Sequence, residues 1–464
     1  MKYIFYDTET TGLEAAYDQI LQFAALEVDE DLNEIASINI RCRILPYIVP
    51  SPGALMVTGV SPKDLVAPNH SHLEMASEIR NWIMRRSPCL LVGHNSIKFD
   101  ETFLRHAFYR TLHPLYLTNT HGNNRADTMR MAQAAAIFTP GSITVPVSEK
   151  GNPSFRLGPL VRANGIDFKE EDAHDALADV RATLELAKLV RRRAPEIWEQ
   201  MLNNSTKKTA LAFMRSNPAF CLAEINFGKA STYLVSAITN NPKYDAEMAV
   251  FDLNYNPNDY LGCSVEELVA VMKGKEKAIR IVPANSQPII VNTTIGHSIL
   301  EENGTDPEVL RQHIEQIQGA TEFRQRVATA LTMRYADEEA SPHVEQAIYQ
   351  DFPSKADEAI MMAFHKAAAE EKSALCYKLQ DTRYREMAMR VMYTDHPDHM
   401  DSADRHRMEK DFKDRLLTEE KMPWLTIPAA FKELEELRGQ GSKLELLAEI
   451  EIFIQAMHKR FAAI

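Results

Sequence analysis

The stretch YIFYDTETTG, residues 3–12, decides the fold of this chain. Its apolar start predicts a buried strand, and Asp7 and Glu9 follow within that strand. Successive side chains of a strand point to opposite faces, so these two carboxylates share one face. Two neighbouring carboxylates resist ionisation unless a cation lies between them, and their oxygen atoms suit Mg²⁺ or Mn²⁺. A lone D-x-E pair also arises by chance, and a solvated strand end explains it better when nothing accompanies it.

Two later motifs add carboxylates in a defined order. GHNSIKFD, residues 93–100, places Asp100 after a buried strand and at the start of an expected helix. HDALAD, residues 174–179, places His174 five residues before Asp179, where a second helix begins. If the first strand lies beside this second helix, the acidic residues of all three motifs converge.

Convergence would bring Asp7, Glu9, Asp100 and Asp179 into one acidic site with His174 beside it. Four carboxylates around two Mg²⁺ ions, which sit ~3.5–4 Å apart, suit in-line phosphoryl transfer. An imidazole has an unperturbed pKa of about 6.5, so His174 can take the proton from an attacking water at neutral pH. The three motifs together therefore predict a metal-dependent phosphodiester-cleaving site.

Three other polar residues near these motifs have structural interpretations. Asp175 stands at the start of the helix expected over 175–192, and Asp127, in the stretch RAD, lies near the start of the helix expected over 125–137, so both suit N-caps. His94 ends a buried strand, and we expect it to shape the site or to pack rather than to take part in chemistry.

The pattern along the chain changes twice. Strand patterns come first and alternating helix and strand patterns follow, which indicates an α/β or α+β unit of about 190 residues. A β-rich module with one inserted helix follows, because apolar or β-branched runs are separated by turn residues at 220–225, 232–239, 247–253, 278–283 and 288–292. From about residue 345 onward the periodicity is helical, broken near Pro423 and Pro428, which predicts an all-helical C-terminal domain.

Length and composition exclude several classes of protein. At about 150 residues per domain, 464 residues correspond to roughly three domains, and 45% hydrophobic with 25% charged residues excludes disordered and fibrous chains. The net charge of −13 is spread over the chain, so nucleic acid would have to bind through local basic clusters or metal ions. The five scattered cysteines indicate reduced thiols. We expect a cytoplasmic protein, because residues 1–10 lack the apolar segment of a signal peptide and no apolar run is long enough to span a membrane.

The order of these motifs resembles the DEDD exonuclease superfamily in its histidine-bearing branch. The tyrosine branch would have a tyrosine where this chain has Asp175. Longer stretches are similar to the bacterial exonuclease I family over the whole chain, most closely in residues 1–192: QFAALEVD, PGALMVTGVSP, LVGHNSIKFDETFLRHAFYR, GNPSFRLGPLVRANGI and AHDALADVRATLELAKLV. The resemblance implies a ribonuclease H-like exonuclease domain with a mixed central sheet (1–192), an SH3-like β-barrel domain with flanking helices (193–345) and a helical C-terminal domain (346–464).

The same resemblance implies an activity. It is Mg²⁺-dependent 3′→5′ degradation of single-stranded DNA to nucleoside 5′-monophosphates, in DNA repair and recombination. Asp7 would bridge two Mg²⁺ ions, for which Mn²⁺ can substitute. Glu9 and Asp179 would complete one metal site and Asp100 the other, with His174 as general base. The implied partners are single-stranded DNA and the C-terminal tail of single-stranded-DNA-binding protein, with the enzyme as a monomer and without a membrane.

Family positions that contact DNA also map onto this chain. Arg156 corresponds to a substrate-binding arginine, whose fork of donors suits a phosphate oxygen, and Glu9 would contact the substrate as well as metal. Arg105, Tyr116 and Lys207 fall at further DNA-contacting positions. Thr11 departs from the phenylalanine that the family more often has, which puts an aromatic contact to the terminal base at that point in doubt.

Two alternatives remain at this stage. One is another enzyme of the same superfamily, an exoribonuclease or a polymerase proofreading exonuclease; such chains are usually shorter and lack the barrel and the helical domain. The other is a non-catalytic module that binds single-stranded DNA. That module would be expected to have lost at least one metal-binding carboxylate, and this chain keeps all four together with the histidine.

Overall fold

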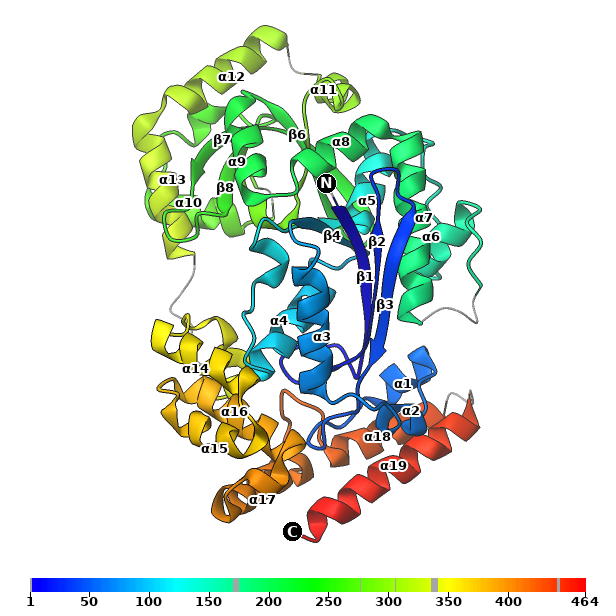
Figure 1. Ribbon diagram of the computed structural model, residues 1–464. Coiled ribbons are helices and arrows are strands. Elements are labelled where there is room, and N and C mark those ends of the chain that lie inside the picture. Colours follow the sequence, from blue (N-terminus) through cyan, green and yellow to red (C-terminus); the bar gives the residue numbers. More distant parts are fainter. Residues whose placement is uncertain (1, 170–174, 276, 305, 335–340, 440–442) are drawn as a thin grey trace.

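A computed structural model describes residues 2–169, 175–275, 277–304, 306–334, 341–439 and 443–464 (Figure 1). At its centre lies a five-stranded mixed sheet with the order β3-β2-β1-β4-β5. The strands are β1 Lys2–Thr10, β2 Ile20–Val28, β3 Glu34–Arg41, β4 Cys89–Gly93 and β5 Asn124–Asp127. β1 pairs antiparallel with β2 and parallel with β4, so it is the middle strand. The acidic stretch therefore lies at the centre of the sheet.

Helices cover both faces of this sheet, and the alternation of β1 decides which face each residue meets. Tyr6 packs into a core on the side of α3 and α4, whereas Phe5 packs into the opposite core with α5 and α7. Asp7 and Glu9 share the parity of Phe5 and so belong to the α7 side. The helices of this part are α1 Pro52–Thr58, α2 Pro62–Val66, α3 His72–Met84, α4 Asp100–Arg110, η1 Leu117–Asn119, α5 Thr128–Phe138, α6 Leu157–Ala163, α7 Ala176–Arg193 and α8 Pro195–Asn203.

A second five-stranded sheet, antiparallel throughout, forms the β-rich module (green at the top of Figure 1). Its strand order is β10-β6-β7-β8-β9, and α9 packs on one face while α10 and α13 pack on the other. All five predicted β runs are confirmed. The elements are α9 Lys207–Ser216, β6 Phe220–Asn226, β7 Lys229–Asn240, β8 Glu247–Asp252, η3 Pro257–Asp259, α10 Val265–Lys273, β9 Ile279–Pro283, η4 Ala284–Ser286, β10 Ile289–Val291, α11 His297–Asn303, α12 Pro307–Gly319 and α13 Thr321–Met333.

The C-terminal part is helical, as predicted, and packs against the α3 and α4 side of the central sheet (yellow to red in Figure 1). Tyr47 stacks on Phe412 with ring centroids 4.4 Å apart, and Tyr109 meets Tyr384 edge-on at 5.4 Å. The elements are η5 Val344–Tyr349, α14 Lys355–Lys366, α15 Ala369–Lys378, α16 Thr382–Asp395, η6 Pro397–His399, α17 Ser402–Leu417, α18 Ile427–Arg438 and α19 Leu444–Ala462. Because this part and the β-rich module each share a core with the central sheet, the domain boundaries at 192 and 345 stay predictions.

One element prediction is wrong in detail. The helix expected over 125–137 begins only at Thr128, because Asn124–Asp127 form strand β5 beside β4. So short a strand does not show the alternation that marks a strand in the sequence. Asp127 caps α5 by accepting a hydrogen bond from the Met129 backbone N–H at 3.0 Å, so its predicted capping role is confirmed. Among the described residues no helix combines the length and the hydropathy needed to cross a membrane.

Candidate active site

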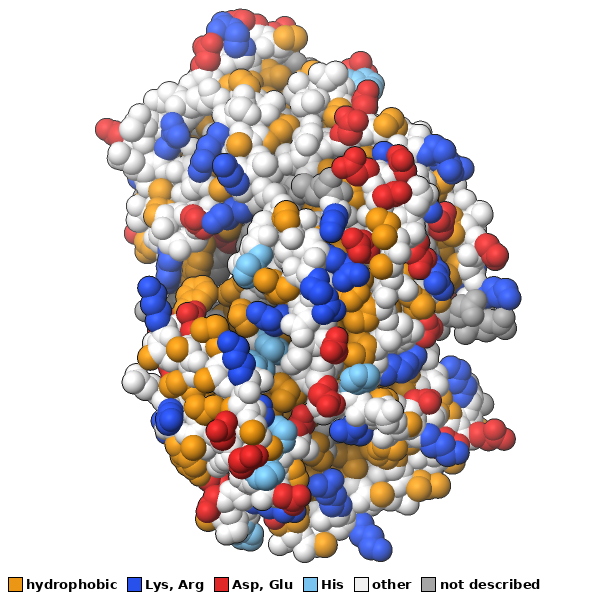
Figure 2. Space-filling view, viewed as in Figure 1, with side chains coloured by type: hydrophobic (Ala, Val, Ile, Leu, Met, Phe, Trp, Pro, Cys, Tyr) orange, Lys and Arg blue, Asp and Glu red, His pale blue; other side chains and the backbone are white. Residues whose placement is uncertain are grey.

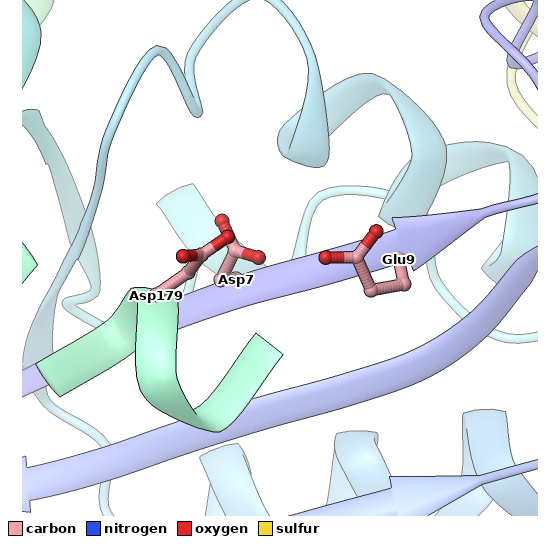
Figure 3. A group of neighbouring side chains, drawn as sticks. All are labelled: Asp7, Glu9 and Asp179. Atoms are coloured by element: carbon pink, nitrogen blue, oxygen red, sulfur yellow. The ribbon is translucent and has the colours of Figure 1, made fainter. Parts of the chain in front are cut away.

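Three of the predicted carboxylates meet between strand β1 and the first turn of helix α7. Asp7, Glu9 and Asp179 each offer an oxygen atom, and these atoms lie within 4.8 Å of one another. Figure 3 shows the carboxylates of Asp7 and Asp179 side by side, with Glu9 farther along the same strand and turned toward them. The convergence expected from the spacing is therefore present for these three residues.

Asp175 fixes the start of α7 over the sheet. Its side chain caps the helix by accepting from the Leu177 and Ala178 backbone N–H groups. The same carboxylate accepts from Gln22 Nε2 and from Arg41 Nη2, both at 3.1 Å. Gln22 pairs with Glu9 on β1 and with Arg41 on β3, so the three side chains form one row across the sheet. Asp179 follows one turn after this anchor, which explains why it faces β1.

Asp100 lies beside the group of three carboxylates. It opens α4 after the turn that follows β4, and its Oδ1 accepts a hydrogen bond from Thr8 Oγ1 at 2.6 Å. Thr8 alternates with Asp7 and Glu9 on β1, so Asp100 approaches the strand from its other face. Its charge still acts on the group, because Asp100 is one of the causes that raise the pKa of Asp7.

The carboxyl groups share a strongly unfavourable electrostatic environment. Burial and the charges of Asp100, Asp179 and Glu9 raise the pKa of Asp7 well above its usual range. Burial and the same kind of repulsion raise the pKa of Glu9 to about 9, and burial raises the pKa of Asp100 to about 7. A buried, mutually repelling set of oxygen donors fits a divalent cation such as Mg²⁺ or Mn²⁺, because the cation offsets the charges that otherwise oppose ionisation.

These raised pKa values predict how the stability of the metal-free protein depends on pH. The folded state holds protons on Glu9 and Asp100 that the unfolded chain releases above about pH 4.5. These two groups therefore favour the folded state at low pH. This contribution to the free energy of unfolding is lost as the pH rises through their folded-state pKa values of about 7 and about 9. We expect the thermal midpoint in EDTA to fall between pH 6 and pH 9, and Mg²⁺ to remove most of this fall. A midpoint in EDTA that rises over that interval would contradict the prediction.

The residues expected to contact DNA from α4 and η1 lie together. The Arg105 guanidinium carbon is 4.9 Å from the centre of the Tyr116 ring, and Arg105 Nη2 pairs with Glu101 Oε1 at 2.6 Å. The Tyr116 ring also lies 5.8 Å from that of Phe352, which is exposed. The arrangement forms an aromatic surface with a cation held beside it.

The remaining predicted contacts are spread over the molecule. Arg156 occupies the N-cap position of α6 and is exposed. Lys207 begins α9 in the β-rich module, where its ammonium group pairs with Asp245 at 2.9 Å. His174, the expected general base, lies outside the described residues. The roles of these residues stay predictions.

Thr11 has a structural role at the position where the family more often has phenylalanine. It is fully buried, donates a hydrogen bond to Asp18 Oδ1 at 2.9 Å, and accepts one from the Gln19 backbone N–H at 3.0 Å. These bonds hold the loop between β1 and β2. The side chain therefore lies in the protein interior.

Sequence reasoning missed Gln22, Arg41 and Thr8. A signal existed for Gln22, because it is a polar residue inside the apolar run ILQFAALEV and is fully buried there. A buried amide needs hydrogen-bond partners, which predicts a polar neighbour across the sheet. Arg41 and Thr8 carry no such signal, because threonine suits any strand and an arginine at the end of a strand is typical of a surface position, although Thr8 is in fact buried.

A central strand with paired carboxylates, completed by the first turn of a helix across the sheet, defines a ribonuclease H-like exonuclease domain. A family model described as Exonuclease matches residues 4–187, and one described as Exonuclease I C-terminal domain matches residues 342–457. Together the two models match well over half of the chain. The chain belongs to the bacterial exonuclease I family, as its motifs predicted.

Curated relatives agree with this assignment, and solved structures share the fold. Exodeoxyribonuclease I of Haemophilus influenzae is 28% identical over 405 residues, covering 83% of this chain and 84% of the relative. Exodeoxyribonuclease I of Escherichia coli is 26% identical over 422 residues, covering 87% and 88%. The fold matches E. coli exonuclease I in complex with a dA16 oligonucleotide, with a TM-score of 0.86 at 23% identity over 98% of this chain and 99% of that one. It also matches exonuclease I from Methylocaldum szegediense, with a TM-score of 0.84 at 24% identity over 98% and 99%.

Proposed function

We propose that this exonuclease degrades single-stranded DNA from the 3′ end and releases nucleoside 5′-monophosphates. The observation that carries the proposal is the meeting of Asp7, Glu9 and Asp179 within 4.8 Å, with Asp100 beside them. DNA as the substrate is supported by the relatives named exodeoxyribonuclease I, which this chain matches over most of their length. A role in DNA repair and recombination follows from the same family.

The four carboxylates are the groups that would hold two Mg²⁺ ions. Asp7 would contribute to both sites, Glu9 and Asp179 to one, and Asp100 to the other. When bound, such ions supply Lewis-acid activation of water and stabilise the charge on attacking and leaving oxygens. The protein holds these carboxylates in place. For Asp179 this is done by the N-cap Asp175, which is bound by Gln22 and Arg41.

The other residues would act on the substrate and on the proton. Arg156 would bind an oxygen of a DNA phosphate through its guanidinium donors and hold the terminal phosphodiester against the carboxylates. The oxygen of water attacks phosphorus, the bond from phosphorus to the 3′-oxygen of the preceding nucleotide breaks, and His174 accepts the proton that the water loses. The leaving 3′-oxygen takes a proton from solvent.

A single strand is the form of DNA that suits this site. A duplex end would have to fray before its scissile phosphate could reach the carboxylates. A structure of similar fold is a complex with a dA16 oligonucleotide, which supports the same substrate class here. The rings of Tyr116 and Phe352, with Arg105 beside them, would stack on DNA bases, which is worth about 1–3 kcal/mol per base. On the face in Figure 2 acidic and basic side chains are interspersed, so strand binding would depend on such local groups.

The partner and the location are also proposals. One solved structure of similar fold is that of SSB/Exonuclease I in complex with the inhibitor CFAM, which supports binding of the tail of single-stranded-DNA-binding protein here. We propose a monomer, as the family resemblance implies, and a cytoplasmic location, as the sequence predicts.

A labelled oligonucleotide tests the activity, its polarity and its site together. A 5′-labelled single-stranded DNA is incubated with Mg²⁺ and either the wild type or Asp179→Ala, each with and without EDTA. We expect a ladder that shortens from the 3′ end with the wild type alone and disappears in EDTA. A 5′-labelled RNA of the same sequence runs in parallel. Faster turnover of RNA would move the assignment to an exoribonuclease, and turnover of neither substrate would move it to a binding module.

A further inference from the structure

His94 sits in the turn that joins β4 to α4, and it makes two hydrogen bonds to other parts of the domain. Its Nε2 lies 2.7 Å from the backbone carbonyl oxygen of Phe155. Its Nδ1 lies 3.0 Å from Thr128 Oγ1 at the start of α5. One ring therefore connects three segments that are far apart in the sequence.

The partners decide the tautomer of this ring. A carbonyl oxygen can only accept, so Nε2 carries the hydrogen and donates it to Phe155. Nδ1 is then the acceptor nitrogen and faces the Thr128 hydroxyl, which also lies within donating distance of the Gly93 carbonyl at 3.2 Å. Burial lowers the pKa of His94, which keeps the ring neutral at neutral pH and preserves this pattern of one donor and one acceptor.

The turn that carries His94 is itself held firmly. Asp127 Oδ1 accepts from the Asn95 backbone N–H at 2.9 Å and from the Met129 backbone N–H at 3.0 Å. Gly93 is packed closely, because a Cβ there would lie 2.5 Å from the Cβ of Ser96. The imidazole is therefore a fixed point on the same turn that leads into α4 and Asp100.

Phe155 immediately precedes Arg156, whose backbone begins α6 and whose side chain is exposed. The backbone before it runs through a loop, where Ser154 N–H donates to the Pro146 carbonyl at 2.8 Å. The bond from His94 thus ties the backbone at Arg156 to the turn that carries Asp100. Because the Arg156 side chain is exposed, the position of its guanidinium group depends on the position of the Arg156 backbone.

We propose that His94 is a positioning residue that holds Arg156 in register with the catalytic carboxylates. This inference rests on the proposed function, in which Arg156 binds a phosphate of the DNA. It assigns His94 no contact with substrate or metal. Loss of the Nε2–H donor would let the backbone at Phe155 shift, and a misplacement of about 1 Å is enough to weaken a bidentate contact.

A double-mutant cycle tests the proposal on the full chain with 5′-labelled single-stranded DNA and Mg²⁺. The variants are His94→Leu, which removes both ring nitrogens, His94→Gln, which keeps a donor, Arg156→Ala, and the double variant His94→Leu/Arg156→Ala. We expect His94→Leu to raise KM about tenfold while kcat stays within about twofold, and His94→Gln to restore part of the loss. In the Arg156→Ala background, His94→Leu should raise KM less than about twofold further.

The outcomes separate this inference from the proposed function. If Arg156→Ala raises KM but the effect of His94→Leu is fully additive to it, His94 does not act through Arg156 and the inference is wrong. If Arg156→Ala leaves KM unchanged, the assigned role of Arg156 is wrong, and the positioning role of His94 is overturned with it. An unchanged KM in His94→Leu overturns the inference alone.

Two further measurements exclude a general loss of structure. The rise in thermal midpoint on adding Mg²⁺ should be the same for His94→Leu and the wild type, because the carboxylates are untouched. If His94→Leu fails to fold, Thr128→Val serves instead. It removes the hydroxyl on Nδ1 and should raise KM in the same direction by about two- to fivefold with kcat retained. A Thr128→Val enzyme with wild-type KM would then overturn the proposal.

Discussion

Replacing Asp7 with Asn is expected to lower exonuclease turnover by at least about 10³-fold and to raise the thermal midpoint of the metal-free protein. Turnover falls because Asp7 is central to the set of carboxylates that would hold the metal ions. The midpoint rises because Asp7 is buried against Asp100, Asp179 and Glu9, which keep its pKa well above the usual range. Ionising Asp7 therefore costs more free energy in the folded protein than in the unfolded chain, and an amide does not ionise.

The measurement combines the rate of shortening of a labelled strand with thermal unfolding in EDTA and in Mg²⁺. Asp167→Asn is the matched control, because Asp167 is an exposed aspartate of the same domain outside the carboxylate group. It should leave the rate and both midpoints unchanged. A lower midpoint for Asp7→Asn in EDTA would mean that the Asp7 carboxylate stabilises the folded protein. Wild-type turnover would place the active site elsewhere.

The parts of the site that lie within one element could be predicted from the sequence. Alternation along β1 places Asp7 and Glu9 on the same face, and the N-cap preference for aspartate predicts that Asp175 and Asp127 cap their helices. The structure confirms each of these predictions. Such predictions succeed because strand period and N-cap preference depend on a few neighbouring residues.

Contacts between distant segments could not be predicted in the same way. The row of Glu9, Gln22 and Arg41 depends on the register of three strands, and a shift by one residue would turn every side chain to the other face. The pairing of His94 with Phe155 depends on the path of the long loop between α5 and α6. The motif GHNSIKFD predicts Asp100 as part of the site, but the Thr8 bond that holds Asp100 appears only in three dimensions.

Glu345→Gln is expected to lower the free energy of unfolding by about 3–5 kcal/mol. Glu345 is buried where the C-terminal part meets the central domain, and its Oε1 accepts from Arg390 Nη1 at 2.7 Å and from Arg415 Nη1 at 2.5 Å. The arginine side chains are only 11% and 13% exposed, so removing the carboxylate leaves two guanidinium charges without their buried partner. Urea unfolding at pH 7 measures the loss, and a change below about 1 kcal/mol would contradict it.

Glu386→Gln is the matched control for Glu345→Gln, because Glu386 also pairs with Arg390, at 3.1 Å, but from a more exposed position. Its removal should cost at most about 1 kcal/mol. The two variants keep the same volume and lose one charge each. Each also removes a carboxylate that pairs with two arginines, because Glu386 Oε2 lies 3.6 Å from Arg407 Nη2, so they differ mainly in burial. Equal losses would show that burial of the Glu345 carboxylate does not determine its contribution.

The pH dependence identifies charge as the origin of the Glu345 effect. Burial alone would raise the pKa of Glu345, but Arg390 and Arg415 outweigh burial and lower it to about 2. A carboxyl group with a depressed pKa stabilises the folded state fully above its unfolded value of about 4.5, and this contribution is lost as pH falls toward 2. The difference in unfolding free energy between wild type and Glu345→Gln should therefore be largest at pH 7 and smaller at pH 3. A difference that stays the same at both pH values would assign the loss to altered packing of the amide, since packing does not titrate.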